Sequence, residues 1–129
     1  MKLSEYFENA KGKGILATAD ISGKVNAAVY ARPHFMDETT IAFIMAERLT
    51  HENLQSNPHA CYLFLEEGPG YAGKRLYLTK TEENSNSELI KDLRRGHRHG
   101  EHGADSNGNR YLVYFRIDKV LSLTSSQTE

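Results

Sequence analysis

The 129-residue sequence has one cysteine, three prolines and no tryptophan, and it contains no long apolar run. Because Cys61 is alone, no intrachain disulfide can stabilise the fold. The longest apolar stretches, such as Ile41 to Ala46, are strand-sized and far shorter than the roughly 20 residues of a membrane-spanning helix. The formal net charge of −1 provides no overall basic field to attract nucleic acid or an anionic membrane. Any anion site must therefore be local.

The length and the N-terminus fit one domain over residues 1–129. A chain of this size buries roughly two thirds of the surface that it exposes when unfolded, so one core suffices. Lys2, Glu5 and Glu8 interrupt the region where a secretory signal would need an apolar stretch. We therefore expect a soluble cytoplasmic protein with no nucleic-acid or membrane partner.

Apolar periodicity divides the chain into short helices and strands. Helices are expected at residues 3–10, 50–56 and 86–95, and strands at 15–20, 24–35, 39–46, 60–66, 74–81 and 110–123. Short connections without crossover helices make neighbouring strands antiparallel. The sequence thus predicts a mainly β fold, a six-stranded antiparallel barrel with short helices at its rim.

Two of these strands, within residues 41–46 and 60–65, are apolar on both faces. One small barrel interior cannot bury both faces of both strands, and the excess must be covered. The pattern therefore predicts a homodimer.

Residues 96–109 are rich in glycine, histidine and polar side chains, with almost no apolar residue to bury. We expect a mobile surface loop, because burial could not offset the entropy of ordering it. His97, His99 and His102 could ligate a metal or meet a haem, but their spacing is loose and no cysteine accompanies them. No metal site is predicted.

A strand, a short loop and a helix follow one another between Ile41 and Pro58. The Arg48 guanidinium, the Thr50 hydroxyl and the backbone N–H groups at the helix start would converge on one point, with Thr50 as the expected helix cap. This arrangement favours a phosphate, although many such junctions are merely a solvated arginine beside an ordinary cap.

The order of four segments resembles the pyridoxamine 5′-phosphate oxidase-like FMN-binding split β-barrel family. The segments are Val29-Tyr30-Ala31-Arg32, the strand Ile41 to Ala46, Arg48-Leu49-Thr50-His51-Glu52-Asn53-Leu54, and Asn57-Pro58 followed by Phe64. The match spans about 40 residues, and the remaining elements are compatible with the same split barrel.

The resemblance implies FMN bound at a homodimer interface. By similarity, one subunit would contribute a strand residue, a loop and a helix start: Arg32, Met45, Ala46, Glu47, Arg48, Leu49, Thr50 and Asn53. The second subunit would close the site with the segment Tyr71 to Arg75 and with Tyr77. The site residues expected from this subunit are Tyr71, Lys74, Arg75 and Tyr77.

No catalytic residue is identified from the pattern. Cys61 lies in an apolar strand and is interpreted as a buried small side chain, and no paired carboxylates or catalytic triad are found. Since a flavin would carry the chemistry itself, an FMN-dependent oxidoreductase acting on an unknown small substrate is the leading hypothesis. The alternatives are a flavin- or haem-binding protein without turnover and a cofactor-free dimeric barrel.

Overall fold

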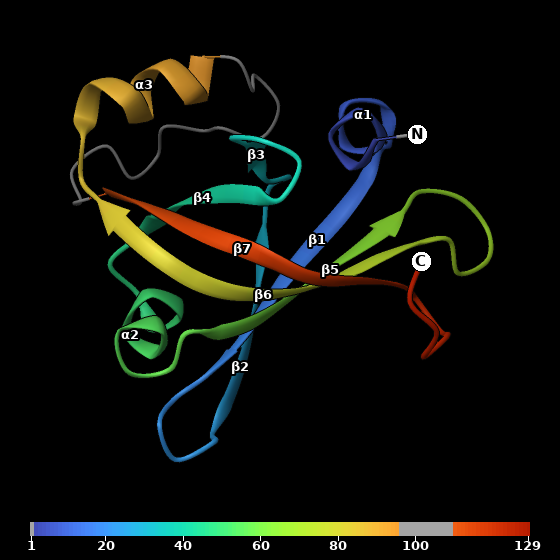
Figure 1. Ribbon diagram of the computed structural model, residues 1–129, viewed down its shortest axis with the longest axis horizontal. Coiled ribbons are helices and arrows are strands. Elements are labelled where there is room, and N and C mark those ends of the chain that lie inside the picture. Colours follow the sequence, from blue (N-terminus) through green and yellow to red (C-terminus); the bar gives the residue numbers. More distant parts are fainter. Residues whose placement is uncertain (1, 96–109) are drawn as a thin grey trace.

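The computed structural model describes residues 2–95 and 110–129. The expected histidine-rich loop, residues 96–109 with His97, His99 and His102, lies outside the described residues. The seven strands found in the described residues form one antiparallel sheet in the order β2-β1-β5-β6-β7-β4-β3 (Figure 1). The strands are β1 (Gly12–Ala19), β2 (Val25–Tyr30), β3 (His34–Phe35), β4 (Thr40–Ala46), β5 (His59–Glu66), β6 (Gly73–Asn84) and β7 (Arg110–Ser122).

The sequence predicted six strands, whereas the sheet has seven because the expected strand 24–35 is split in two. β2 pairs with β1, and β3 pairs with β4 at the other end of the sheet. Pro33 lies between them, and proline cannot donate a ladder hydrogen bond. The barrel type is likewise not confirmed: β2 and β3 are the two edges of the sheet, and no ladder joins them among the described residues.

The sheet nevertheless curls around its core. Tyr30 of β2 contacts Phe43 of β4 edge to face, with ring centroids 5.9 Å apart, although these strands lie near opposite edges. The largest fully buried side chains between the two halves are Tyr62, Phe43, Phe64, Phe115 and Leu16. This curvature brings β2 close to the elements that follow β4.

Within residues 2–95 and 110–129, three short helices accompany the sheet: α1 (Leu3–Asn9), α2 (Leu49–Ser56) and α3 (Ser87–Arg95). α2 ends before Asn57-Pro58, as predicted. Its N-cap position is occupied by Arg48, not by Thr50, which lies one residue inside the helix and is buried. None of the helices described is long and apolar enough to cross a membrane.

α3 explains part of the apolar excess that the sequence assigned to a second subunit. Ile90 of α3 packs with Ala42 of β4 and Leu112 of β7 in a small buried cluster. Part of the second apolar face of β4 is therefore covered within the same chain, and this part of its pattern does not require a partner.

Candidate functional site

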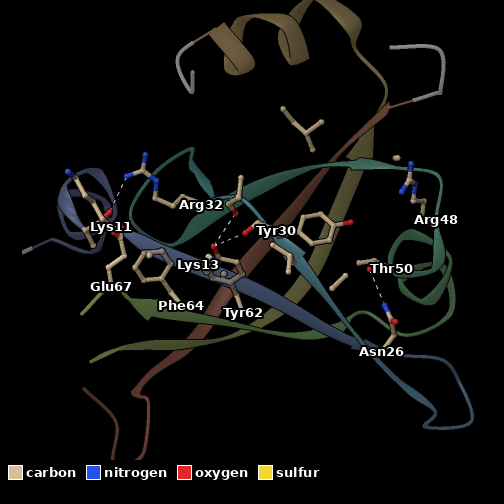
Figure 2. Close-up of a pocket in the computed structure, with 18 of the residues that line it drawn as sticks. Lys11, Lys13, Asn26, Tyr30, Arg32, Arg48, Thr50, Tyr62, Phe64 and Glu67 are labelled. Atoms are coloured by element: carbon tan, nitrogen blue, oxygen red, sulfur yellow. Dashed lines mark hydrogen bonds between the residues drawn. The ribbon is translucent and has the colours of Figure 1, made fainter. Parts of the chain in front are cut away.

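An open groove runs along β1 and β2 from α1 to α2, with a volume of about 1210 Å³. Its walls include the inward-facing side of β2, the ends of β1 and β5, and the loop between β4 and α2. Figure 2 shows Arg48 and Thr50 at one end, Arg32 and Lys11 at the opposite end, and Tyr30 between them. The groove is larger than the roughly 300–1,000 Å³ of most small-molecule sites.

Positive charge is concentrated in this groove. Among its described lining residues, five are basic and two are acidic, in a chain whose net charge is −1. The basic residues are Lys11, Lys13, Arg32, Arg48 and Arg110, and the acidic ones are Glu8 and Glu67. The groove therefore has a local excess of positive charge that can attract an anion, although the net charge of the chain is slightly negative.

The first end of the groove is built around the start of α2. The Thr50 hydroxyl accepts a hydrogen bond from Asn26 Nδ2 of β2 at 3.2 Å, which ties the helix to the sheet. Arg48 precedes the helix, and Arg110 of β7 lies opposite Ala46 in the β4–β7 ladder. A guanidinium, a hydroxyl and the unpaired N–H groups of a first helical turn are the donors that a phosphate favours.

Tyr30 joins this end to the middle of the groove. Burial raises the pKa of its hydroxyl, while a hydrogen bond with Thr50 and the positive charge of Arg48 act in the opposite direction. The Tyr30 hydroxyl is therefore within the same polar cluster as Thr50 and Arg48, and its ring forms an aromatic wall.

Tyr62 of β5 forms the floor between the two ends. It is fully buried, and its hydroxyl donates to the Ala31 carbonyl oxygen at 3.1 Å. Burial raises its pKa, so it remains a neutral hydrogen-bonding group. Gly14 of β1 passes directly over this hydroxyl: a Cβ built on Gly14 would lie 1.9 Å from Tyr62 Oη. Only glycine allows β1 to approach the tyrosine this closely.

The other end lies beside α1. Arg32 Nη1 donates to the Phe7 carbonyl oxygen at 2.7 Å and to that of Ala10 at 3.3 Å. Arg32 thereby satisfies carbonyls at the C-terminus of α1, where a positive charge is favourable. Lys11 and Lys13, at the start of β1, line the same end.

A second set of contacts holds α2 from the side away from β2. The buried His51 ring stacks on Tyr111 of β7, with centroids 4.0 Å apart, and His51 Nε2 lies 3.0 Å from Glu83 Oε2 of β6. Lys80 Nζ pairs with Glu83 Oε1 at 2.7 Å. Burial alone would raise the pKa of Glu83, but hydrogen bonds from Lys80, Gln55 and His51 lower it to about 2.

The structure brings together part of the predicted set. The residues of that set that line the groove are Arg32, Ala46, Arg48, Leu49 and Thr50. The other three from the same region do not line it. Met45 is buried in the core, Glu47 accepts a hydrogen bond from the Tyr111 hydroxyl at 3.2 Å, and Asn53 donates to Thr18 Oγ1 at 3.1 Å.

The residues expected from a second subunit lie outside the groove of their own chain. Tyr71 is 82% exposed, and Lys74 pairs with Glu129 at 2.6 Å. Arg75 donates to the carbonyl oxygens of Ser122 and Ser125. The Lys119 ammonium nitrogen lies over the ring of Tyr77, 4.9 Å from the ring centroid. Their contribution to a partner's site stays a prediction.

Sequence reasoning missed the lining residues that come from β1 and the residue before it, and from β2, β5 and β7. These are chiefly Lys11, Lys13, Asn26, Tyr30, Tyr62 and Arg110. One signal was present: Asn26, Ala28 and Tyr30 alternate along β2 and face inward together. A polar residue and a tyrosine on the inward face of a strand would have indicated a site wall. Within residues 2–95 and 110–129, no group of three or more potential metal ligands is found.

The sequence matches no protein-family model and no curated protein sequence. Its structure is similar to that of an FMN-binding protein from Syntrophomonas wolfei subsp. wolfei, with a TM-score of 0.79 and 18% identity over 98% of this chain and 86% of that chain. It is also similar to a protein from Listeria innocua provisionally assigned as a pyridoxamine 5′-phosphate oxidase, with a TM-score of 0.68 and 19% identity over 96% and 97% of the two chains. An F420 reductase matches with a TM-score of 0.67 and 18% identity over 91% and 94%.

At these identities the similarities establish a shared fold. The fold that the sequence resemblance implied is thus found among structures described as FMN-binding, as an F420 reductase and as pyridoxamine 5′-phosphate oxidase-like.

Proposed function

We propose that this chain binds FMN in the groove and acts as a flavin-dependent oxidoreductase on a small substrate. The observation that carries the proposal is the anion-binding end at Arg48, Thr50 and the start of α2, which continues directly into a wall containing Tyr30. A phosphate joined to a planar ring system fits such an arrangement. The fold shared with an FMN-binding protein supports the same conclusion.

The donor chemistry of the groove suits FMN. Arg48 and Thr50 would hold the phosphate, with Arg110 adding positive charge and Asn26 fixing the Thr50 hydroxyl. Tyr30 would border the ring system. When bound, FMN supplies one- and two-electron transfer, and the protein's part is to position the ring and exclude competing reactions.

A homodimer forms part of this proposal, and its support is the outer face of the sheet. Ile15 of β1 stands in register between Val29 of β2 and Leu63 of β5, and Val29 is 78% exposed. Arg75 of β6 follows Leu63 in the same row. A second copy on this apolar stripe would bury it and would bring Arg75 close to the partner.

FMN titration of purified protein tests the phosphate end. Arg48→Ala should weaken FMN binding by about 1 to 3 kcal/mol, because a hydrogen bond to a charged group is lost, and should leave folding nearly intact. Riboflavin, which has no phosphate, should bind both proteins alike. Arg116→Ala is the matched control, since Arg116 lies on β7 outside the groove and pairs with Asp118.

Equal losses of affinity for FMN and riboflavin in Arg48→Ala would mean that Arg48 does not contact the phosphate.

The visible spectrum of the purified protein separates the alternatives. Flavin absorption maxima support the proposal, and a Soret band would indicate haem. A colourless protein that also does not bind added FMN would indicate a cofactor-free barrel. Oxidation of reduced FMN by a substrate then distinguishes an enzyme from a flavin carrier.

A further inference from the structure

Tyr111 of β7 contacts the residues on both sides of the segment Arg48 to Thr50. The segment lines the groove, whereas Tyr111 packs against the main hydrophobic core cluster. The Tyr111 ring stacks on that of His51, with centroids 4.0 Å apart and an angle of 12° between the planes. Its hydroxyl donates to Glu47 Oε1 at 3.2 Å. One side chain therefore contacts the residue before the segment and the residue after it.

His51 is itself held in place by β6. The ring is buried, and its Nε2 lies 3.0 Å from Glu83 Oε2. The other carboxylate oxygen of Glu83 accepts hydrogen bonds from Lys80 Nζ at 2.7 Å and from Gln55 Nε2 at 3.0 Å. Because residues four apart lie on the same face of a helix, one carboxylate holds the face of α2 that carries His51 and Gln55. Tyr111 thus stacks on a ring whose orientation is fixed.

The contacts on the groove side of the segment come from a different part of the sheet. The Thr50 hydroxyl accepts a hydrogen bond from Asn26 of β2 at 3.2 Å (Figure 2). The Tyr30 hydroxyl, also of β2, hydrogen-bonds with Thr50 and lies close to the positive charge of Arg48. The segment is therefore held between β2 on the groove side and β6 and β7 on the other.

The start of α2 needs this support from outside. α2 has eight residues, and Arg48 at its N-cap position makes no side-chain capping hydrogen bond. The Glu52 N–H closes the first turn by donating to the Arg48 carbonyl oxygen at 2.9 Å. Helices this short are marginal in isolation, and the donors of a binding site must be held to within about 0.5 Å. The contacts from the sheet must supply that precision.

We infer that Tyr111 is a positioning residue: its stacked ring holds Arg48 and Thr50 in place and thereby sets the preference for a flavin that carries a phosphate. Tyr111 acts through His51 and does not itself contact the cofactor. The ring carries this role rather than the hydroxyl, whose bond to Glu47 is exposed to solvent. The inference rests on the proposed FMN site and adds to it a residue outside the groove.

Titration with FMN and with riboflavin, followed by flavin fluorescence, tests the inference because only FMN carries the phosphate. Tyr111→Leu removes the stacked ring and should lower the ratio of FMN affinity to riboflavin affinity about fivefold or more, since the charged hydrogen bonds to the phosphate are displaced. Tyr111→Phe keeps the ring and should retain most of the ratio of the unaltered protein. His51→Gln keeps an N–H donor for Glu83 but removes the stack, and it should lower the ratio as Tyr111→Leu does. It provides the test if Tyr111→Leu does not fold.

Tyr114→Leu is the matched control and should leave the ratio unchanged. Tyr114 lies on the same strand and packs beside the cluster that α3 covers, away from the groove. Three results would overturn the inference: an unchanged ratio in both Tyr111→Leu and His51→Gln, equal losses of affinity for the two flavins in these variants, or the same fall in the ratio in Tyr114→Leu.

If the unaltered protein does not prefer FMN to riboflavin, the proposed phosphate site fails separately. Amide hydrogen exchange then tests Tyr111 without a cofactor. The Glu52 N–H should exchange faster in Tyr111→Leu than in Tyr111→Phe or the unaltered protein, because the first turn of α2 opens more easily. The Ile90 N–H of α3, which donates to the Asn86 carbonyl oxygen at 3.0 Å, should exchange at the same rate in all three proteins. An unchanged rate at Glu52 would show that Tyr111 does not position the segment.

Discussion

At the scale of single residues, the groove depends on side chains that serve the fold and the surface at once. Tyr62 fills the core with its ring and fixes the chain after β2 through its hydroxyl bond to the Ala31 carbonyl. Arg32 completes the end of α1 and lines the groove. Such residues couple the shape of the groove to the stability of the sheet. Substitutions at these positions should therefore change both ligand binding and the free energy of unfolding.

Gly14→Ala should destabilise the protein by about 1 to 3 kcal/mol, because the added methyl group would overlap the Tyr62 hydroxyl and ring. Urea unfolding monitored by circular dichroism measures the loss. Tyr62→Phe alone should cost about 1 kcal/mol through its lost hydrogen bond. The double variant should cost less than the two single changes added together, since the nearest overlapping atom is gone. Strict additivity would mean that β1 moves away from Tyr62 at little cost.

At the scale of elements, α2 positions Arg48 and Thr50 at one end of the groove. It is eight residues long, and its N-cap residue makes no side-chain capping hydrogen bond. Isolated helices of this length are marginal, so tertiary contacts must hold it. Asn26 holds it from the β2 side, and Glu83 of β6 holds His51 and Gln55 on successive turns.

Glu83 should give this element a measurable dependence on pH. Its pKa is lowered from 4.5 to about 2 in the folded protein, so its stabilising contribution is present above 4.5 and is lost as the pH falls towards 2. At pH 7, Glu83→Gln should lower the unfolding free energy by on the order of 1 kcal/mol, a value reduced for solvent screening. The difference from the unaltered protein should shrink between pH 4.5 and 2 in urea unfolding. Glu82→Gln, at the exposed neighbouring residue, is the control and should show neither effect. If the difference in unfolding free energy between Glu83→Gln and the unaltered protein stays constant with pH, the Glu83 carboxylate is not the source of the pH dependence.

The local signals for these elements were readable in the sequence, whereas their meeting in space was not. Asn57-Pro58 predicted the end of α2, and Arg48 and Thr50, which the sequence placed together at its start, both line the groove. The cap assignment failed because the helix begins at Leu49, which places Thr50 inside the first turn. The Thr50 hydroxyl instead accepts a hydrogen bond from Asn26, a residue 24 positions earlier that the curl of the sheet brings beside α2. Lys11 and Lys13 were missed for the same reason: nothing local to β1 indicates which groove it borders.

At the scale of the whole molecule, the outer face of the sheet remains apolar after α3 has covered β4. The proposed dimer should therefore depend on Ile15, which stands inside the exposed stripe but does not line the groove. Ile15→Asp should shift the mass measured by light scattering at micromolar concentration from dimer to monomer, because burying an unpaired carboxylate is costly. Ile21→Asp changes a more exposed isoleucine in the β1–β2 turn and should leave the mass unchanged. A monomeric unaltered protein would contradict the shared-site arrangement.

The order of strands also sets how late the groove can form while the chain folds. β1 pairs with β5 across about 40 intervening residues, and β4 pairs with β7, so that Thr40 lies opposite Arg116. Such distant pairings carry a large loop-closure entropy, and sheets dominated by them fold in roughly milliseconds to seconds, slower than helical bundles. The hairpin of β1 and β2 can close early, but the Tyr62 floor arrives only with β5 and Arg110 only with β7. A growing chain therefore carries both cationic ends of the groove before it has the sheet that holds them apart.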